Sequence, residues 1–264
     1  MKLGFIGTGN MASAIMGGII KNQIIPANEI IGADVMEAGR KRVKEQFGIQ
    51  VTADNHEVVR NSDVVILSVK PQFYAEVIAE IKDDVREDQI IITIAPGKTL
   101  AWLKEQFGKN VKIVRTMPNT PALVGEGMTA ACPNEYMTKE EIAYVRTLLE
   151  SFGRVEIIPE RLMDTVVSVS GSSPAYVFMF IEAMADAAVS GGMPRAQAYQ
   201  FAAQAVLGSA KMVLETGKHP GELKDMVCSP AGTTIEAVRV LEEKGFRSAV
   251  IEAMKTCEEI SKNM

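Results

Sequence analysis

Small residues near the start of the chain are spaced to hold a phosphate group. Gly7, Gly9 and Ala12 follow a short apolar stretch, and a helical pattern of apolar residues runs from Met11 to Ile20. The first glycine allows a tight turn, the second lets a pyrophosphate approach the backbone, and the alanine lets the helix pack on the strand. This setting, between a predicted strand and a predicted helix, favours dinucleotide binding over an ordinary turn.

Asp34 ends the second predicted strand, where it could contact the ribose of a dinucleotide. A carboxylate there can accept both ribose hydroxyls of NADH and would repel the 2′-phosphate of NADPH. An ordinary acid at a strand end is the alternative. Arg40, Lys41 and Arg42 could reach a phosphate, although a solvated helix face explains such a run better. We therefore predict NADH or NADPH as cofactor, with NADH used at least as well.

Three further turns follow predicted strands and are candidates for the walls of a nicotinamide site. They read Ser68-Val69-Lys70-Pro71, Ala95-Pro96-Gly97 and Met117-Pro118-Asn119-Thr120-Pro121. In an open α/β sheet the ligand lies beyond the carboxyl ends of the strands. Any one of these turns could be plain loop chemistry, but three at consecutive strand ends favour a site.

Two hydroxyl-rich loops lie in the second half of the chain, at 168–174 and 228–234. Each places hydroxyl groups and a glycine directly before a predicted helix, where free backbone N–H groups can receive a carboxylate. Helix capping is the alternative for each loop. We interpret the first as a cap and the second as a substrate site.

The elements that must position these residues form an α/β half. Apolar stretches of strand length alternate with helical segments at 2–6, 29–33, 63–69, 90–94 and 111–115. A last strand is predicted at 154–158, after a helix that begins with the capping box Thr138 and Glu141. The pattern predicts a Rossmann-like dinucleotide-binding domain over 1–159.

The second half, 160–264, is predicted to be an all-helical domain. Long segments rich in Ala, Met, Leu and Glu lie at 174–190, 195–216, 232–244 and 247–262, separated by glycine-containing breaks. The segment 174–190 is apolar or small nearly all round, which indicates the centre of a bundle or a subunit interface.

Composition narrows the possible partners of the chain. A net charge of −5 without a long basic run argues against nucleic acid and anionic membranes. Residues 1–9 reach a glycine turn after a few apolar residues, which predicts neither a signal peptide nor a membrane span. The three cysteines are widely separated and lack zinc-site spacing, so we expect no metal and a cytoplasmic location.

Histidine and lysine usage argues against hydroxy-acid chemistry. The chain has only two histidines, and neither lies beside the loops above, so a histidine base is not supported. The 3-hydroxyacid dehydrogenases use a lysine soon after a glycine-rich helix start, whereas the first lysine after Gly171 is Lys211. A C=N substrate does not need such a histidine or lysine, because an iminium accepts hydride without a strong enzymic acid.

Segments spread over almost the entire chain resemble the pyrroline-5-carboxylate reductases, which reduce Δ1-pyrroline-5-carboxylate to L-proline. They are GFIGTGNMA at 4–12, SVKPQ at 68–72, RTMPNTPALVGEGMT at 115–129, SVSGSSPAYVF at 168–178, GGMPRAQA at 191–198 and HPGELKDMVCSPAGTTIEAV at 219–238. The last segment is the most specific, since the GxGxxA pattern occurs in many unrelated enzymes.

The resemblance implies a role for each matching position. Ser229 and the backbone of Gly232 and Thr233 would hold the substrate carboxylate, while Thr234 would bond the ring nitrogen. The implied assembly is an intertwined homodimer, with a pentamer of dimers as a larger form. The implied cofactor residues are Ile6, Gly7, Thr8, Gly9, Asn10, Met11, Ala12, Asn55, Ser68, Val69, Lys70, Pro71, Ala95, Gly97 and Asn119.

The chain departs from the family pattern at three places. Residues 95–98 read Ala-Pro-Gly-Lys where a second alanine and a hydrophobe are usual, and Val35 stands where an arginine is frequent. Ala231 replaces a glycine, which puts in doubt any backbone conformation there that needs a positive φ.

Two other functions remain open on the sequence. The chain could be another imine reductase or a relative of the 3-hydroxyacid dehydrogenases, which activity with pyrroline-5-carboxylate would distinguish. It could also be a non-catalytic NAD(P)-binding regulator, although such a sensor does not need a second anion receptor at 229–234.

Overall fold

The computed structural model describes residues 1–263 and divides the chain into two compact units. The first contains Met1–Ser172 together with the C-terminal residues from Cys257 onward. The second contains Ser173–Thr256 and is entirely helical apart from its turns. The predicted α/β half and the predicted helical half are both confirmed.

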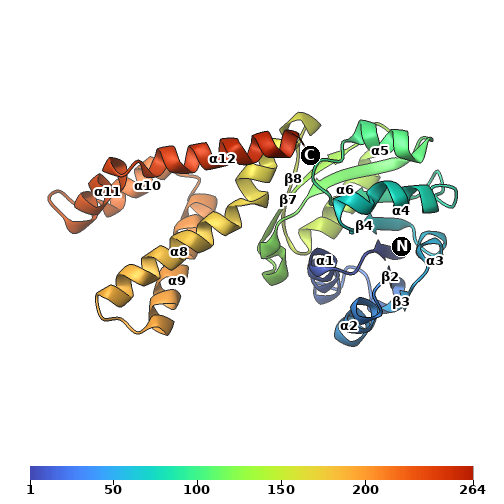
Figure 1. Ribbon diagram of the computed structural model, residues 1–264, viewed down its shortest axis with the longest axis horizontal. Coiled ribbons are helices and arrows are strands. Elements are labelled where there is room, and N and C mark those ends of the chain that lie inside the picture. The colour runs from blue at the N-terminus through green and yellow to red at the C-terminus, as the bar shows by residue number, and fades with distance from the viewer. Residues whose placement is uncertain (264) are drawn as a thin grey trace. The chain divides into compact units, whose positions relative to one another are not determined.

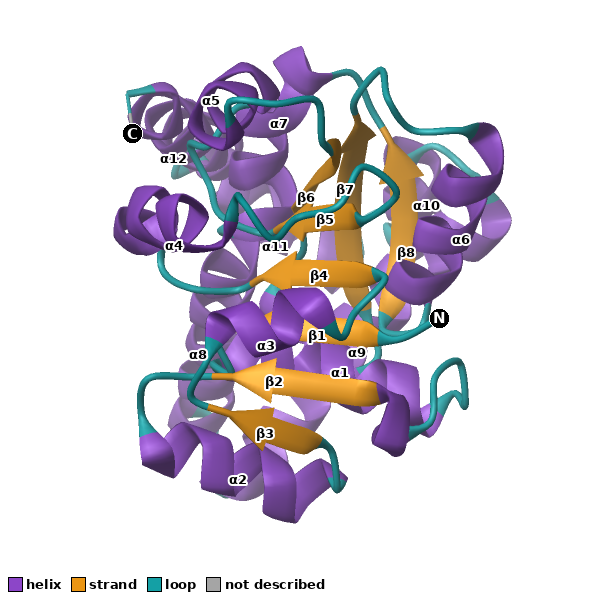
Figure 2. Ribbon diagram, turned by 90° about the vertical axis from the view of Figure 1, so that its right-hand side faces the viewer, coloured by secondary structure: helices purple, strands orange, loops and turns teal. Residues whose placement is uncertain are grey.

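The first unit is built on one eight-stranded sheet with the order β3-β2-β1-β4-β5-β6-β7-β8 (Figure 2). Among the strand pairs of residues 1–263, β6 and β7 alone are antiparallel. The strands are β1 (Leu3–Ile6), β2 (Ile30–Ala33), β3 (Gln50–Thr52), β4 (Val64–Leu67), β5 (Ile90–Thr93), β6 (Lys112–Met117), β7 (Gly127–Pro133) and β8 (Gly153–Ile157).

Six of these strands are predicted by their apolar stretches, while β3 and β7 are not. Strand β3 has three residues and lies at the edge of the sheet, so it lacks a buried apolar run. Strand β7 reads Gly-Met-Thr-Ala-Ala-Cys-Pro, and its small residues give a weak pattern. Its burial results from pairing with β6 on one side and β8 on the other.

Helices cover both faces of the sheet because neighbouring residues of each strand point to opposite sides. Val64 and Ile66 of β4 pack with the helices at Asn10–Lys21 and Lys139–Glu150, whereas Val65 and Leu67 pack with helices that lie between Asn55 and Phe107. The helices are α1 (Asn10–Lys21), α2 (Glu37–Phe47), α3 (Asn55–Arg60), α4 (Tyr74–Ile81), α5 (Leu100–Phe107) and α6 (Lys139–Glu150). The predicted capping box is confirmed, since Thr138 and Glu141 exchange both of its hydrogen bonds.

The segment after β8 is helical, and it corrects one expectation. Residues 168–171 are not part of a loop, because α7 (Met163–Val166) continues into a π-helical turn, Val167–Gly171, shortly before α8 (Ser173–Ser190) begins. Ser168 and Ser170 donate to the carbonyls of Thr165 and Val166 in the preceding turn instead of capping a helix.

The second unit contains α8 (Ser173–Ser190), α9 (Arg195–Thr216), α10 (Pro220–Val227), α11 (Thr233–Glu243) and most of α12 (Phe246–Lys262). Helices α8 and α9 lie side by side (Figure 1). The sequence predicts four of these helices. The missed one, α10, lies in the break that follows α9, where His219, Pro220 and Gly221 indicate a turn and also form its first turn.

A large apolar surface of these helices is uncovered within the single chain. Phe178, Met179 and Phe201 are each more than 60% exposed. By length and composition alone, the helical run 160–190 could cross a membrane, and only 6% of its most apolar window is buried. Such a surface needs a partner or a lipid phase to cover it.

Candidate active site

The turn after β1 requires glycine at its first position. Gly7 has a φ of +96°, and a β-carbon there would lie 2.8 Å from the carbonyl carbon and oxygen of Ser68. Ser68 in turn donates its hydroxyl to the carbonyls of Ile6, at 3.1 Å, and Gly7, at 2.7 Å. The ends of β1 and β4 are therefore fixed against each other.

Gly9, by contrast, faces open space. It precedes α1, and a β-carbon added there would meet no described atom within 4 Å. Among the described residues no side-chain cap is found at Gly9, the N-cap of α1, and a helix leaves its first N–H groups without intrahelical acceptors. An exposed backbone with free donors at a helix start is the cradle that a pyrophosphate needs, so the turn fits a dinucleotide.

The sheet order places this cradle at a crevice. The chain goes from β1 to β2 on one side and later enters β4 on the other side of β1, which opens a gap beyond the strand ends. The carboxyl ends of β4 and β5 lie along the same edge, since β1, β4 and β5 are parallel. The predicted residues at 6–12, at 68–71, Ala95 and Gly97 follow these strand ends.

Asp34 contacts the glycine turn directly. Its Oδ2 accepts hydrogen bonds from the amide and the hydroxyl of Thr8, both at 2.8 Å, and its Oδ1 accepts from the Met36 amide at 2.9 Å. Burial raises the pKa of Asp34, but the hydrogen bonds from Met36 and Thr8 outweigh burial and lower it. The carboxylate is ionised and holds the turn, and Oδ1 keeps one acceptor position for a ribose hydroxyl.

Arg40 and Arg42 of α2 contact the backbone near the glycine turn, and of the two Arg40 is half-buried while Arg42 is exposed, as on a solvated helix face. Arg40 donates to the carbonyl of Asp34 at 2.6 Å, and Arg42 donates to the carbonyl of Thr8. Lys41 points away, with 74% of its side chain exposed beside Glu45. The sequence alone does not distinguish these three charged residues. In the folded helix, Lys41 points away from the side that carries the two arginines.

Asn55 opens α3 and is turned toward α4. Its Nδ2 donates to Oε2 of Glu80 at 2.9 Å. Asp54, His56 and Glu80 offer ligand atoms within 4.8 Å of one another, as a metal site would. These groups already have partners, because Asp54 caps α3 through the His56 amide and His56 Nδ1 pairs with Asp84 at 2.5 Å. The cluster is explained as a helix cap joined to ion pairs.

The pairing of His56 gives a testable pH dependence. The hydrogen bond with Asp84 raises the pKa of His56, so this pair stabilises the fold fully below the unfolded pKa of about 6.5 and loses its effect as the pH rises through the folded value. Proton NMR should show one imidazole titrating above about 6.5. The resonance should disappear in His56→Gln and move down in Asp84→Asn. An unchanged titration in Asp84→Asn would contradict the pairing.

The side chain of Asn119 is held by hydrogen bonds to two other segments and does not point freely into the crevice. Its Nδ2 donates to the carbonyl of Ser170 at 2.9 Å, and its Oδ1 accepts from the Met128 amide at 2.8 Å. The residue is 8% exposed. It joins the end of β6 to the start of β7 and to the π-helical turn.

Tyr74 is a positioning residue that sequence analysis missed. It is fully buried, and its hydroxyl donates to the carbonyl of Leu67 and accepts from the Ile94 amide at 3.3 Å. Burial raises the pKa of Tyr74, which keeps the hydroxyl protonated. It therefore joins the ends of β4 and β5. In the sequence, this role was indicated only by the presence of a tyrosine in a helix pattern that is otherwise apolar.

The second unit carries the hydroxyl-rich turn before α11. Gly232 precedes the helix, no side chain caps it, and the Gly232 amide donates to the carbonyl of Ser229 at 3.0 Å. Ala231 has a φ of +55°, so the left-handed conformation is kept without a glycine, at a cost of about 1 kcal/mol. Ser229 and Thr233 are exposed and Thr234 is half-buried. The turn presents hydroxyls beside unpaired helix N–H groups, as an anion receptor requires.

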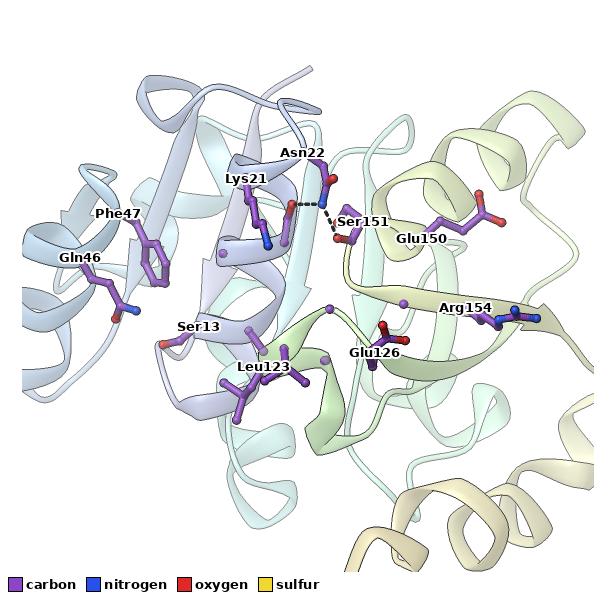
Figure 3. Close-up of a pocket in the computed structure, with 17 residues that line it drawn as sticks. Ser13, Lys21, Asn22, Gln46, Phe47, Leu123, Glu126, Glu150, Ser151 and Arg154 are labelled. Carbon is purple, nitrogen blue, oxygen red and sulfur yellow. Dashed lines mark hydrogen bonds between the residues drawn. The ribbon is translucent and has the colours of Figure 1, made fainter. Parts of the chain in front are cut away.

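A separate cavity of about 690 Å³ runs along α1 (Figure 3). Lys21, Glu126 and Arg154 give it charges of both signs, and the exposed Leu123 lies at its rim. Asn22 crosses its end, donating to the carbonyl of Ser151 at 2.7 Å. None of the predicted cofactor or substrate residues lines this cavity.

Known proteins resemble the chain in both halves. Residues 160–264 match a family profile described as pyrroline-5-carboxylate reductase dimerisation, and residues 2–97 match one described as NADP oxidoreductase, coenzyme F420-dependent. The pyrroline-5-carboxylate reductase of Escherichia coli strain K12 is 55% identical over 100% of this chain and 98% of its own length.

Two solved structures share the complete fold. A pyrroline-5-carboxylate reductase from Coxiella burnetii has a TM-score of 0.92 at 35% identity, covering 99% of this chain and 97% of its own. The Plasmodium falciparum pyrroline carboxylate reductase, solved with NADP bound, has a TM-score of 0.91 at 33% identity, covering 100% and 97%.

Proposed function

Because the chain belongs to the pyrroline-5-carboxylate reductase family, we propose that it reduces Δ1-pyrroline-5-carboxylate to L-proline with NADH or NADPH, the last step of proline biosynthesis. The observation that carries the proposal is the open glycine cradle at Gly9, in a chain that is similar to such reductases over its whole length. The enzyme is an oxidoreductase acting on a CH–NH group.

The cofactor would be held by residues of the first unit. A bound nicotinamide supplies the hydride. The glycine turn binds the pyrophosphate through backbone N–H groups, while Asp34 keeps that turn in place and offers Oδ1 to the ribose. We assign to the cofactor side Ile6, Gly7, Thr8, Gly9, Asn10, Met11, Ala12, Asp34, Asn55, Ser68, Val69, Lys70, Pro71, Ala95, Gly97 and Asn119, with Asn119 acting through the backbone it braces.

The substrate would be held by the turn before α11. Ser229 and the amides of Gly232 and Thr233 receive the carboxylate, and Thr234 bonds the ring nitrogen. The uncapped helix start supports this assignment, because its N–H groups favour an anion without an arginine. Thr234 then orients the imine carbon, which saves the entropy of alignment.

A spectrophotometric assay tests the proposal. Purified protein should oxidise NADH and NADPH when Δ1-pyrroline-5-carboxylate is added, and should reduce neither NAD nor NADP with 3-hydroxy acids. Cofactor binding without any imine-dependent oxidation would favour a regulator and reject the enzyme.

We propose that NADH is used at least as well as NADPH. The Asp34 carboxylate would repel a 2′-phosphate, and Val35, which is 87% exposed, adds no positive charge. Val35→Arg should therefore raise the NADPH-to-NADH ratio of kcat/KM by about tenfold, roughly 1.4 kcal/mol, while Val35→Gln leaves it unchanged. If the wild type already prefers NADPH by tenfold, Arg40 and Arg42 outweigh Asp34 and the proposal is wrong.

We propose that a second copy of the chain covers the apolar helical face, making a homodimer, with a pentamer of dimers as the larger assembly. Light scattering should give at least twice the chain mass of 28.6 kDa. A stable, active monomer would contradict this. Such a partner also explains the apolar run 160–190 without a membrane.

We place the boundary between the dinucleotide-binding domain, 1–159, and the helical dimerisation and substrate domain, 160–264, where the dimerisation profile begins. We also propose a cytoplasmic location, and the net charge of −5 argues against binding to nucleic acid or to an anionic membrane.

A further inference from the structure

The Glu160 carboxylate joins α5, the helix that follows β5, to the neighbouring strand β6. Its Oε1 accepts a hydrogen bond from the Leu100 amide at 2.7 Å and from Nη1 of Arg115 at 2.8 Å. Leu100 is the first residue of α5, and Arg115 lies in β6. Glu160 itself begins the short 3-10 turn after β8, Glu160–Leu162.

Burial fixes the geometry of this pair. The Arg115 side chain is 6% exposed and that of Glu160 32%, and an apolar cluster of Ala130, Cys132 and Met163 lies in the same region. Burial and then the Glu160 carboxylate raise the pKa of the Cys132 thiol, which places this charge close to the cluster. A buried guanidinium needs its counter-charge, so Glu160 cannot turn away toward solvent without a large cost.

The turn that Glu160 fixes is the β5–α5 turn, residues 94–99. At its start, the Ile94 amide donates to the buried Tyr74 hydroxyl at 3.3 Å. At its end, the Leu100 amide donates to Glu160. Between them, Gly97 adopts a left-handed φ of +73°. The turn is thus held at each end by a side chain that comes from another element.

We propose that Glu160 is a positioning residue for the cofactor site. It acts through the Leu100 amide to set the β5–α5 turn, and it does not touch the ligand. The inference rests on the proposed function, which puts Ala95 and Gly97 of this turn on the cofactor side. A residue that follows the last strand of the sheet, in the same unit, then determines the shape of the β5–α5 turn.

A matched pair at Leu100 tests the hydrogen bond without changing any charge. Leu100→Pro removes the amide donor, and proline is well tolerated as the first residue of a helix. The φ of −74° and ψ of 158° at Thr99 suit the residue before a proline. Leu100→Ala removes the same side chain and keeps the donor. We expect Leu100→Pro to raise the KM for NADH about tenfold above that of Leu100→Ala, with kcat changed by less than about threefold.

A second pair separates the hydrogen bond from the ion pair. Arg115→Met with Glu160→Met and Arg115→Met with Glu160→Gln both lack the buried charges, so neither leaves an unpaired guanidinium. Only the glutamine variant keeps an acceptor for the Leu100 amide. The methionine pair should show the raised KM, and the glutamine pair should remain within about threefold of the wild type.

The hydrogen bond between the Leu100 amide and Glu160 can also be tested without cofactor. Trp102 is the only tryptophan of the chain and lies two residues after Leu100, so quenching of its fluorescence by acrylamide reports on the start of α5. Quenching should be stronger in Leu100→Pro than in Leu100→Ala. Equal KM values and equal quenching in both pairs would overturn the inference and leave Glu160 as a structural ion pair. If no imine-dependent oxidation occurs in the wild type, the proposed function fails. Quenching then still tests whether Glu160 fixes the start of α5 through the Leu100 amide.

Discussion

Gly9→Ala is expected to weaken cofactor binding on the order of 10- to 100-fold while leaving the melting temperature unchanged. A β-carbon at Gly9 meets no described protein atom, so the fold itself should tolerate the change. It would occupy the space through which a pyrophosphate approaches the N–H groups at the start of α1. Loss of one hydrogen bond to a charged group, worth about 1.5–3 kcal/mol, gives this range. The KM values for NADH and NADPH and a thermal melt measure both effects.

Gly7→Ala is the control for this prediction, because it should impair the protein by destabilising the fold and not by blocking the cofactor. A β-carbon there lies 2.8 Å from the Ser68 backbone, and alanine would be forced to a φ of +96°. Both effects act on the folded chain, so the melting temperature should fall, with a cost of about 1–3 kcal/mol or more. If Gly9→Ala keeps a wild-type KM, the turn is not a phosphate cradle. A melting temperature lowered as much as in Gly7→Ala would also contradict this interpretation.

The sequence predicts the elements of this fold well, because burial imposes a period on apolar residues. The runs at β1, β4 and β5 and the long helices after Pro159 all lie where the pattern places them. Strand β7 is missed because its small residues are buried by neighbouring strands, not by an apolar side-chain pattern of its own. Its antiparallel direction depends on the connection 118–126, which contains the 3-10 helix Thr120–Val124 and which no periodicity encodes.

The directions of polar side chains are less predictable, because each is decided by competing hydrogen-bond partners. Asp34 is correctly expected at a strand end, but its main contacts, with Thr8 and Met36, depend on the folded turn. Asn119 is expected at the crevice, yet Ser170, 51 residues away in sequence, receives its amide. Glu160 gives no local signal, since its partners lie in α5 and β6.

Thr234→Ala is expected to lower kcat/KM by a factor on the order of 10 to 10³, about 1.4–4 kcal/mol, as the loss of one positioning hydrogen bond to the substrate would. Cofactor affinity should be nearly unchanged, because the change lies in the second unit. The melting temperature should also be retained, since no side chain caps α11 and alanine favours a helix. Steady-state kinetics with varied imino acid and a thermal melt give these values.

Two neighbouring substitutions sharpen the test of Thr234. Thr234→Ser keeps a hydroxyl and should restore most of the activity, whereas Thr233→Ala removes an exposed side chain whose contribution is assigned to the backbone and should stay near wild type. Wild-type kinetics in Thr234→Ala would reject the role of its hydroxyl. A large fall in melting temperature would show that Thr234 holds the helix start instead. Equal losses in Thr233→Ala and Thr234→Ala would mean that the whole turn, and not one hydroxyl, orients the ring.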